Sequence, residues 1–295
     1  MINTFLGTAP DSWGIWFPDD AQQISWSRYL DEAAAAGYRW TELGPFGYLP
    51  KDPQQLNEEL AARDLQLCGA TIGGALSNAE AMGEIERELA ALMALLDHFE
   101  DAKTVVVLPE SYSDFQTGKQ ILPKEAEPDQ WRQLVTTVRR LAELAKPQGY
   151  QVLFHPHADS WIEHEDQIAR FLDDTEPDEI GLCFDTGHHA YSGGDAVAFF
   201  RRYHARIPYL HLKSVDPKVL DSARQEGLAF AQAVARDVMC EPALGIVDFA
   251  ALREALSTVN YEGFAIVEQD MYPTAPDRPF PIAKRTQAFL TELGF

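Results

Sequence analysis

Cysteine and basic residues are scarce in this chain, and long apolar runs are missing. Three cysteines lie far apart among 295 residues, which excludes a disulfide scaffold and favours a reducing cytoplasm. No apolar run approaches the ~20 residues that a membrane-spanning helix needs. The N-terminus has no basic region followed by an apolar stretch, so we expect no signal peptide. Lys and Arg number 24 against 46 Asp and Glu, and the net charge of −22 repels nucleic acids and anionic membranes.

Several motifs are also missing. The chain has no Walker loop, no GxGxxG fingerprint and no Gly-x-Ser-x-Gly elbow, so nucleotide binding and serine hydrolysis lack support. No internal repeat, low-complexity tract or linker divides it. Because 46% of the residues are hydrophobic, the chain is able to bury a sizeable core. We expect one domain that spans residues 1–295.

Short apolar runs alternate with longer amphipathic stretches along the whole chain. Eight such runs are predicted as strands: residues 5–9, 40–43, 65–71, 104–108, 151–155, 180–184, 209–213 and 264–268. The stretches between them are predicted as helices: 24–36, one that opens at Asp52-Pro53, 78–99, 129–146, 165–173, 196–206, 249–259 and 281–293. Strands that alternate with helices indicate a parallel α/β fold, and eight of them predict a (β/α)8 TIM barrel.

Two connections are longer than such a barrel requires. They are residues 110–128, after the fourth strand, and residues 214–247, after the seventh, where we expect an extra helix around 222–235. Both follow the carboxyl ends of strands, which is the face where barrel enzymes place their active sites.

Polar side chains cluster at the ends of strands five to eight. Four histidines lie at or just past the ends of strands five to seven, and carboxylates end strands six and eight: His155, His157, His188, His211, Asp185 and Glu268. A barrel brings these ends into one ring. Imidazole and carboxylate ligands together suit one divalent ion of Mn, Co, Zn or Fe.

Each of these residues also has a structural interpretation. A lone histidine at a strand end is more often a hydrogen-bonded core or surface residue, and Asp185 before Thr186-Gly187 is typical of a turn. The metal site is favoured because four consecutive strands end this way. Buried charges there would be costly without a cation.

Residues after the first and second strands are further candidates. Trp13, Trp16 and Phe17 form either an apolar wall for a sugar ring or a structural plug of the barrel mouth. Glu42 ends the second strand. Its functional interpretation is a hydroxyl acceptor or general base, and its structural interpretation is a salt bridge.

Three segments resemble the sugar phosphate isomerase/epimerase superfamily, the xylose-isomerase-like barrels. They are Phe-Asp-Thr-Gly-His-His at 184–189, Tyr-Leu-His-Leu-Lys at 209–213 and Val-Glu-Gln-Asp at 267–270. Two more resemble its inosose dehydratase branch, namely Gly-Thr-Ala-Pro-Asp-Ser-Trp-Gly at 7–14 and Thr-Glu-Leu-Gly-Pro-Phe-Gly-Tyr-Leu-Pro at 41–50. The resemblance covers nearly the whole chain.

The resemblance implies roles for particular residues. Asp185, His211 and Glu268 match three metal ligands of the family, while His188 and Lys213 face the substrate. Sugar epimerases present a glutamate at the end of strand five, whereas this chain has His155-Pro156-His157. We take His155 as the fourth ligand, and His157, Glu110 and Glu42 remain open alternatives.

The expected reaction is therefore loss of water from a keto-inositol or related keto sugar. Catalysis is assigned to His157, His188, Glu42 and Lys213, and substrate contacts to Trp13, Glu110, His188 and Lys213. The alternatives are a metal-dependent ketose epimerase or aldose–ketose isomerase, a DNA-repair endonuclease of the same fold, and a non-catalytic sugar- or metal-binding protein. The negative charge counts against the endonuclease, and the chain is compatible with a homo-oligomer.

Overall fold

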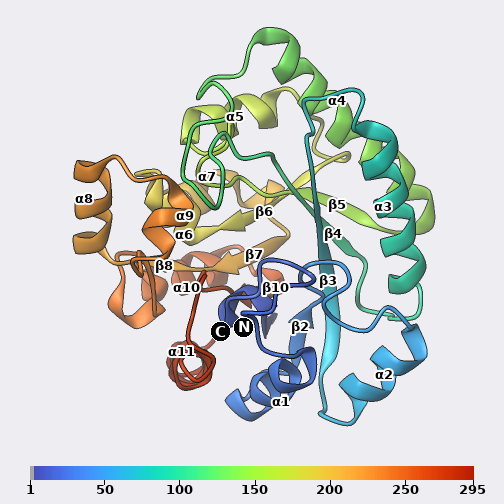
Figure 1. Cartoon of the computed structure of the whole chain (residues 1–295), viewed down its shortest axis with the longest axis vertical. Coiled ribbons are helices and arrows are strands. Elements are labelled where there is room, and N and C mark those ends of the chain that lie inside the picture. Colours follow the sequence, from blue (N-terminus) through green and yellow to red (C-terminus); the bar gives the residue numbers. More distant parts are fainter. Residues whose placement is uncertain (1–2) are drawn as a thin grey trace.

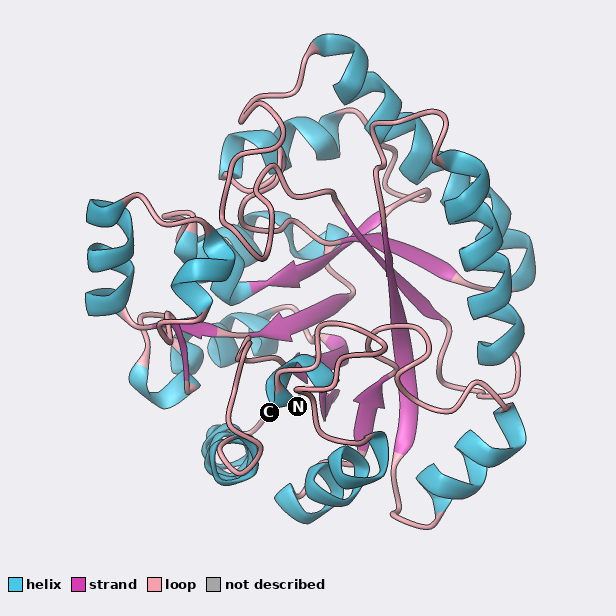
Figure 2. Cartoon of the chain, viewed as in Figure 1, coloured by secondary structure: helices cyan, strands magenta, loops and turns pink. Residues whose placement is uncertain are grey.

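A closed barrel of eight parallel strands forms the centre of the molecule. The computed structural model describes residues 3–295. The strand order around the barrel is β1-β10-β7-β6-β5-β4-β3-β2, and the barrel closes where β1 pairs with β10 from Asn3↔Glu262 to Thr8↔Val267. Figure 2 shows the strands at the centre with helices around them. The predicted TIM barrel is confirmed.

The observed strands differ from the predicted ones by at most two residues at either end. They are β1 (Asn3–Thr8), β2 (Trp40–Glu42), β3 (Gln66–Gly73), β4 (Thr104–Leu108), β5 (Gln151–Phe154), β6 (Gly181–Asp185), β7 (Tyr209–Leu212) and β10 (Glu262–Val267). The helices that follow them are α1 (Trp26–Ala36), α2 (Pro53–Ala61), α3 (Met82–Leu96), α4 (Pro128–Ala145), α5 (Glu165–Asp173), α7 (Ala196–Tyr203), α10 (Phe249–Thr258) and α11 (Pro279–Leu293).

Local sequence signals explain where the helices begin and end. The Ser25 hydroxyl accepts from the amide of Arg28 at the start of α1, and the Asp52 carboxylate accepts from Gln55 before Pro53 opens α2. Helix α1 ends at Gly37, whose φ of 103° lies in the left-handed region that suits glycine.

Two apolar clusters hold the fold together. A small one fills the inside of the barrel and comprises Ala9, Cys68, Val106, Leu153, Cys183, Tyr209 and Ile266. The larger one packs the outer faces of the strands against the helices. Because the barrel interior is filled, ligands reach only the layer above it, at the carboxyl ends of the strands.

The excursion after β7 differs from the prediction. One helix was expected around 222–235, but two form: α8 (Pro217–Glu226) and α9 (Phe230–Val234). Gly227 ends α8 with φ 66°, so the chain reverses before α9. Strands β8 (Ser214–Val215) and β9 (Met239–Cys240) pair antiparallel at the base of this excursion, which stands beside the barrel in Figure 1.

A short helix after β6, α6 (Thr186–Tyr191), was not predicted. Among residues 3–295, no helix is both long and apolar enough to span a membrane.

Candidate active site

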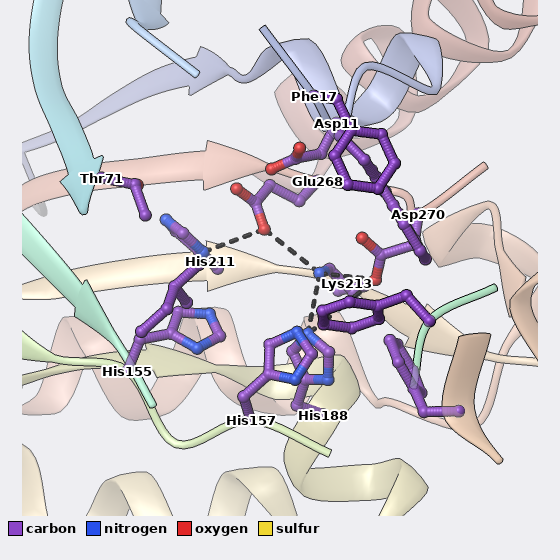
Figure 3. A pocket seen from close by; sticks show the side chains of 14 residues that line it. Asp11, Phe17, Thr71, His155, His157, His188, His211, Lys213, Glu268 and Asp270 are labelled. Carbon is purple, nitrogen blue, oxygen red and sulfur yellow. Dashed lines mark hydrogen bonds and ion pairs between the residues drawn. The ribbon is translucent and has the colours of Figure 1, made fainter. Parts of the chain in front are cut away.

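One cavity lies at the carboxyl ends of the barrel strands. Its volume is about 210 Å³, and it is bordered by side chains that follow β1, β4, β5, β6, β7 and β10. The predicted residues His155, His157, His188, His211, Lys213 and Glu268 all line it. Figure 3 shows these side chains pointing towards one another from different strands.

Four of the lining or adjoining side chains form a cluster able to hold a metal ion. The ligand atoms of His155, Asp185, His211 and Glu268 all lie within 4.8 Å of one another, and all four residues are buried. The inward-facing atoms are His155 Nε2 and Asp185 Oδ2, 3.6 Å apart, and His211 Nδ1 and Glu268 Oε2, 3.0 Å apart. These are the four residues expected from the sequence as ligands, and their ligand role stays a prediction.

The carboxylate of Asp185 has two separate environments. Its Oδ1 accepts hydrogen bonds from the amides of Gly187 at 2.7 Å and His188 at 2.8 Å, and so caps α6. Its Oδ2 faces the cluster. One residue at the end of β6 thus begins a helix and presents an oxygen to the site.

His211 is oriented from beneath by Glu42. Its Nε2 lies 2.9 Å from Glu42 Oε1, and the Tyr209 hydroxyl donates to the same oxygen at 2.8 Å. Burial disfavours the imidazolium, but Cys183, Glu268 and Glu42 raise the pKa of His211, so without a metal Nε2–H donates to Glu42 and Nδ1–H faces Glu268 Oε2 at 3.0 Å. Loss of the Nδ1 proton would free that nitrogen for a metal. A histidine that binds a metal is commonly held by a carboxylate in this way.

The donor set fits a divalent transition metal. Asp185 Oδ2 and His211 Nδ1 are buried atoms without a well-directed hydrogen bond in the described part of the chain, and each lies beside an ionic group, Lys213 Nζ at 3.2 Å and Glu268 Oε2 at 3.0 Å. Buried polar atoms without partners are costly, and a cation would satisfy both. Two imidazoles with two carboxylates suit Mn, Co, Zn or Fe better than Mg or Ca.

His157 presents a free nitrogen to the cavity. Its Nδ1 lies 2.7 Å from the carbonyl oxygen of Ala158, which only accepts, so Nδ1 carries the proton and Nε2 has a lone pair. Burial, with the charges of His155 and Lys213, lowers the pKa of His157 to about 3. The imidazole is therefore neutral and able to accept a proton.

Lys213 stands among acidic groups. Its Nζ lies 2.9 Å from Asp270, 3.1 Å from Glu268 and 3.2 Å from Asp185. Burial disfavours the ammonium, but these three carboxylates outweigh it and raise the pKa of Lys213. The side chain is a buried cation and a proton donor.

His188 bridges Lys213 and His157. Its Nε2 lies 3.2 Å from Lys213 Nζ, its Nδ1 lies 3.3 Å from the amide nitrogen of Ala158, and its ring centroid is 3.9 Å from that of His157. A neutral imidazole has one N–H and one lone pair, so it cannot accept from both Lys213 and Ala158 at once. Burial lowers the pKa of His188, which keeps the ring neutral.

The residues between Asp185 and His188 explain how Lys213 is placed. The Thr186 hydroxyl donates to the Lys213 carbonyl at 2.7 Å and accepts from its amide at 2.9 Å. Gly187 packs against Lys213 so closely that an added Cβ would lie 2.6 Å from Lys213 Cβ and Cγ.

Four predicted site residues do not line the cavity: Asp185, which adjoins it through the cluster, and Trp13, Glu110 and Glu42. Trp13 is buried in the core, where its indole donates to Glu32 at 2.8 Å and packs on Tyr29. Glu110 accepts from the amides of Leu76 and Ser77 and thereby holds the loop after β3. Glu42 lies behind His211. The Trp13 indole and both carboxylates are already engaged in these contacts, which favours a structural or positioning role; the catalytic and substrate-binding roles expected from the sequence stay predictions.

Other lining residues escaped the sequence analysis. They are Asp11, Thr71, Leu108, Phe115, Phe230 and Asp270. Trp16 and Phe17 also line the cavity, in agreement with one of the two interpretations given above, an apolar wall for a sugar ring. Asp11 follows β1 and faces Glu268, and burial together with Glu268 and Asp270 raises the pKa of its carboxyl. The spacing of Asp270 two residues after Glu268 was a usable signal, since alternate residues share a face.

Phe230 comes from the excursion after β7. Its amide donates to Asp159 at 2.8 Å, and its ring lies 5.3 Å from the His157 ring and 4.9 Å from the His188 ring. Nothing in the helical pattern of residues 222–235 indicates that one of its apolar side chains turns towards the strand ends.

Known proteins resemble the chain over its whole length. The model of the xylose isomerase-like TIM barrel family matches residues 30–293. An inosose dehydratase of Lacticaseibacillus casei is 31% identical over 291 residues, which cover 97% of this chain and 95% of that protein. The crystal structure of the IOLI protein with a bound zinc atom has a TM-score of 0.74 at 16% identity, with 99% of both chains covered. An L-ribulose 3-epimerase structure has a TM-score of 0.71 at 19% identity and covers 99% of this chain and 94% of that one.

The residues matched by the family model include seven of the eight barrel strands, the candidate metal cluster and Lys213. The closed barrel, the resemblance of the five motifs and the similarity to inosose dehydratases over the full length all agree. The chain belongs to the xylose isomerase-like TIM barrel family, with inosose dehydratases among its relatives.

Proposed function

We propose that the protein is a divalent-metal-dependent dehydratase that removes water from a keto-inositol or a related keto sugar. The observation that carries this proposal is the pairing of a four-ligand cluster with a neutral base and a buried cation in one cavity. The inosose dehydratase relatives and the zinc-bound neighbour support it.

His155, Asp185, His211 and Glu268 would hold the ion. When bound, it supplies a Lewis acid that polarises the substrate ketone and acidifies the neighbouring C–H. Its identity among Mn, Co, Zn and Fe is open, because the donor set suits all four.

The chain itself moves two protons. His157 Nε2 takes the proton from the carbon beside the ketone, and the electron pair of that bond forms the new C=C bond. The C–O bond to the next carbon breaks, and the Lys213 ammonium gives a proton to the departing hydroxyl, which leaves as water. His188 lies between the two groups, with its ring beside that of His157 and its Nε2 3.2 Å from Lys213 Nζ, and so holds both in position.

The charges of the cavity favour an uncharged substrate. Asp11, Glu268 and Asp270 line it opposite the single cation Lys213, and no arginine lies among the lining residues in the described part of the chain. A sugar phosphate would meet this acidic wall at a cost. A neutral polyol instead has hydroxyl groups that donate hydrogen bonds to these carboxylates.

The alternative is a ketose epimerase or aldose–ketose isomerase, which begins with the same proton abstraction. The L-ribulose 3-epimerase shares the fold. Against this alternative, strand five ends in His155 and His157 instead of the glutamate that sugar epimerases present there.

Incubation of the metal-loaded protein with keto-inositols and ketohexoses in heavy water tests the proposal. We expect a keto-inositol to yield a product lighter by one water, with the new ultraviolet absorbance of a conjugated enol-dione. The Asp185→Asn variant, which lacks one ligand charge, serves as the inactive control. Epimerised ketohexoses with α-deuterium, and no water loss from any keto-inositol, would replace the proposal by the alternative.

A further inference from the structure

Beneath the candidate metal cluster lies a buried thiol that the proposed reaction does not use. Cys183 is in β6, two residues before Asp185, so both side chains point to the same side of the strand. Its Cα is paired with Tyr209, one layer below the pair Asp185↔His211. Cys183 is fully buried and not in a disulfide.

The thiol shares two neighbours with the upper cluster. Ligand atoms of His155, Cys183 and His211 all lie within 4.8 Å of one another. The pairing Phe154↔Leu182 places His155 level with Cys183 on the adjacent strand.

Two buried imidazoles accompany this thiol. His155 is 1% exposed, and its Nδ1 has no hydrogen-bond partner in residues 3–295. His211 Nδ1 lies beside Glu268 Oε2 at 3.0 Å and has no well-directed hydrogen bond in the same residues. Figure 3 shows the His155 and His211 rings side by side, and their planes are inclined at 56°. Two buried imidazoles beside a free thiol form a donor set that binds metals.

We propose that His155, Cys183 and His211 form a second, lower metal position that takes a thiophilic divalent cation such as Cd²⁺. An oxygen-preferring ion such as Mn²⁺ favours the upper position with its two carboxylates, whereas a thiolate selects softer ions. Because the two imidazoles belong to both positions, an ion at one excludes an ion at the other.

The geometry requires only small side-chain movements. In a tetrahedral zinc site, bonds of about 2.0–2.3 Å place the ligand atoms about 3.4–3.6 Å apart. The three atoms here lie within 4.8 Å of one another, so rotations of the rings and of the thiol suffice to close the gap. On binding, the S–H bond breaks, its proton leaves to solvent and a sulfur–metal bond forms.

Titration of the metal-free protein with Cd²⁺ tests the lower position. Thiolate-to-cadmium charge transfer absorbs in the ultraviolet, and we expect this band to grow to one equivalent. Cys183→Ser should abolish the band and lower the Cd²⁺ affinity at least about tenfold, since it removes the soft ligand. Cys68→Ser is the matched control, because Cys68 is a second thiol buried in the same interior cluster.

Two more measurements keep the outcome decisive. Cys183→Ser should bind Mn²⁺ with wild-type affinity by electron paramagnetic resonance, which also shows that the variant folds. Cadmium-113 NMR of the wild-type protein should give the downfield shift of a sulfur ligand. A shift typical of nitrogen and oxygen ligands alone, or a charge-transfer band retained in Cys183→Ser, overturns the proposal. Neither readout depends on the proposed dehydration.

Discussion

Replacing Glu42 by glutamine distinguishes a positioning role from a catalytic one. Glu42 is 1% exposed, and its Oε1 accepts from both His211 Nε2 and the Tyr209 hydroxyl. The amide keeps the shape but removes the charge. It also offers an N–H₂ group that competes with the proton on Nε2 and disfavours the tautomer whose Nδ1 faces the cluster.

The expected size of the effect follows from this hydrogen bond. Bonds to charged groups contribute about 1.5–3 kcal/mol, and each ~1.4 kcal/mol is tenfold in affinity. We therefore expect Glu42→Gln to bind Mn²⁺ about 10–100-fold more weakly, which agrees with the effects of carboxylates behind metal-bound histidines. Isothermal titration calorimetry of the metal-free protein measures this directly.

Tyr209→Phe is the matched control. It removes the other hydrogen bond to the same oxygen but leaves the carboxylate, so its loss of metal affinity should stay below about tenfold, the scale of one neutral hydroxyl donor. Wild-type Mn²⁺ affinity in Glu42→Gln, together with a large fall in turnover at saturating metal, would refute this reasoning. It would restore the catalytic role expected from the sequence.

Three further predictions concern charge, packing and pH. Lys213→Met should reduce turnover at least about 100-fold and destabilise the fold by about 3–5 kcal/mol, because Asp185, Glu268 and Asp270 lose their cation; an unchanged urea midpoint would contradict this. Gly187→Ala should cost about 1–3 kcal/mol through the 2.6 Å approach to Lys213, whereas Gly83→Ala, whose nearest contact is 3.6 Å in α3, should not destabilise. Burial lowers the pKa of His189 to about 4, so between about pH 6.5 and pH 4 the unfolded chain binds a proton that the folded chain does not, and stability falls as the pH decreases. His189→Leu should flatten this part of the pH–stability curve measured by urea unfolding, and an equally steep curve would show that other groups cause it.

The sequence predicted the barrel well because periodicity and turn chemistry are local properties. The eight apolar runs, the proline after Asp52 and the glycine after α1 all report on neighbouring residues. The meeting of His155, Asp185, His211 and Glu268 was also predictable from the sequence, because residues at the ends of barrel strands lie in one ring once a barrel is assumed.

The remaining site residues depend on orientations that the sequence does not encode locally. The short turn Pro10–Trp13 brings Asp11, for which no role was expected, to the cavity beside Glu268, and buries Trp13 away from it. Glu42 lies on the inward side of β2 but one layer too deep for the cavity, and that depth follows from the register between strands. Phe230 reaches the site only because Gly227 reverses the chain.

The excursion that carries Phe230 adds to the cavity wall without adding to the candidate metal cluster. It leaves the barrel at β8 and returns at β9, paired only to each other, and contributes an aromatic wall but none of the four clustered ligands. Residues 217–238 therefore supply Phe230 to the cavity from outside the barrel. Under the proposed function, exchange of this segment between relatives would alter which ring is accepted without changing the four clustered side chains.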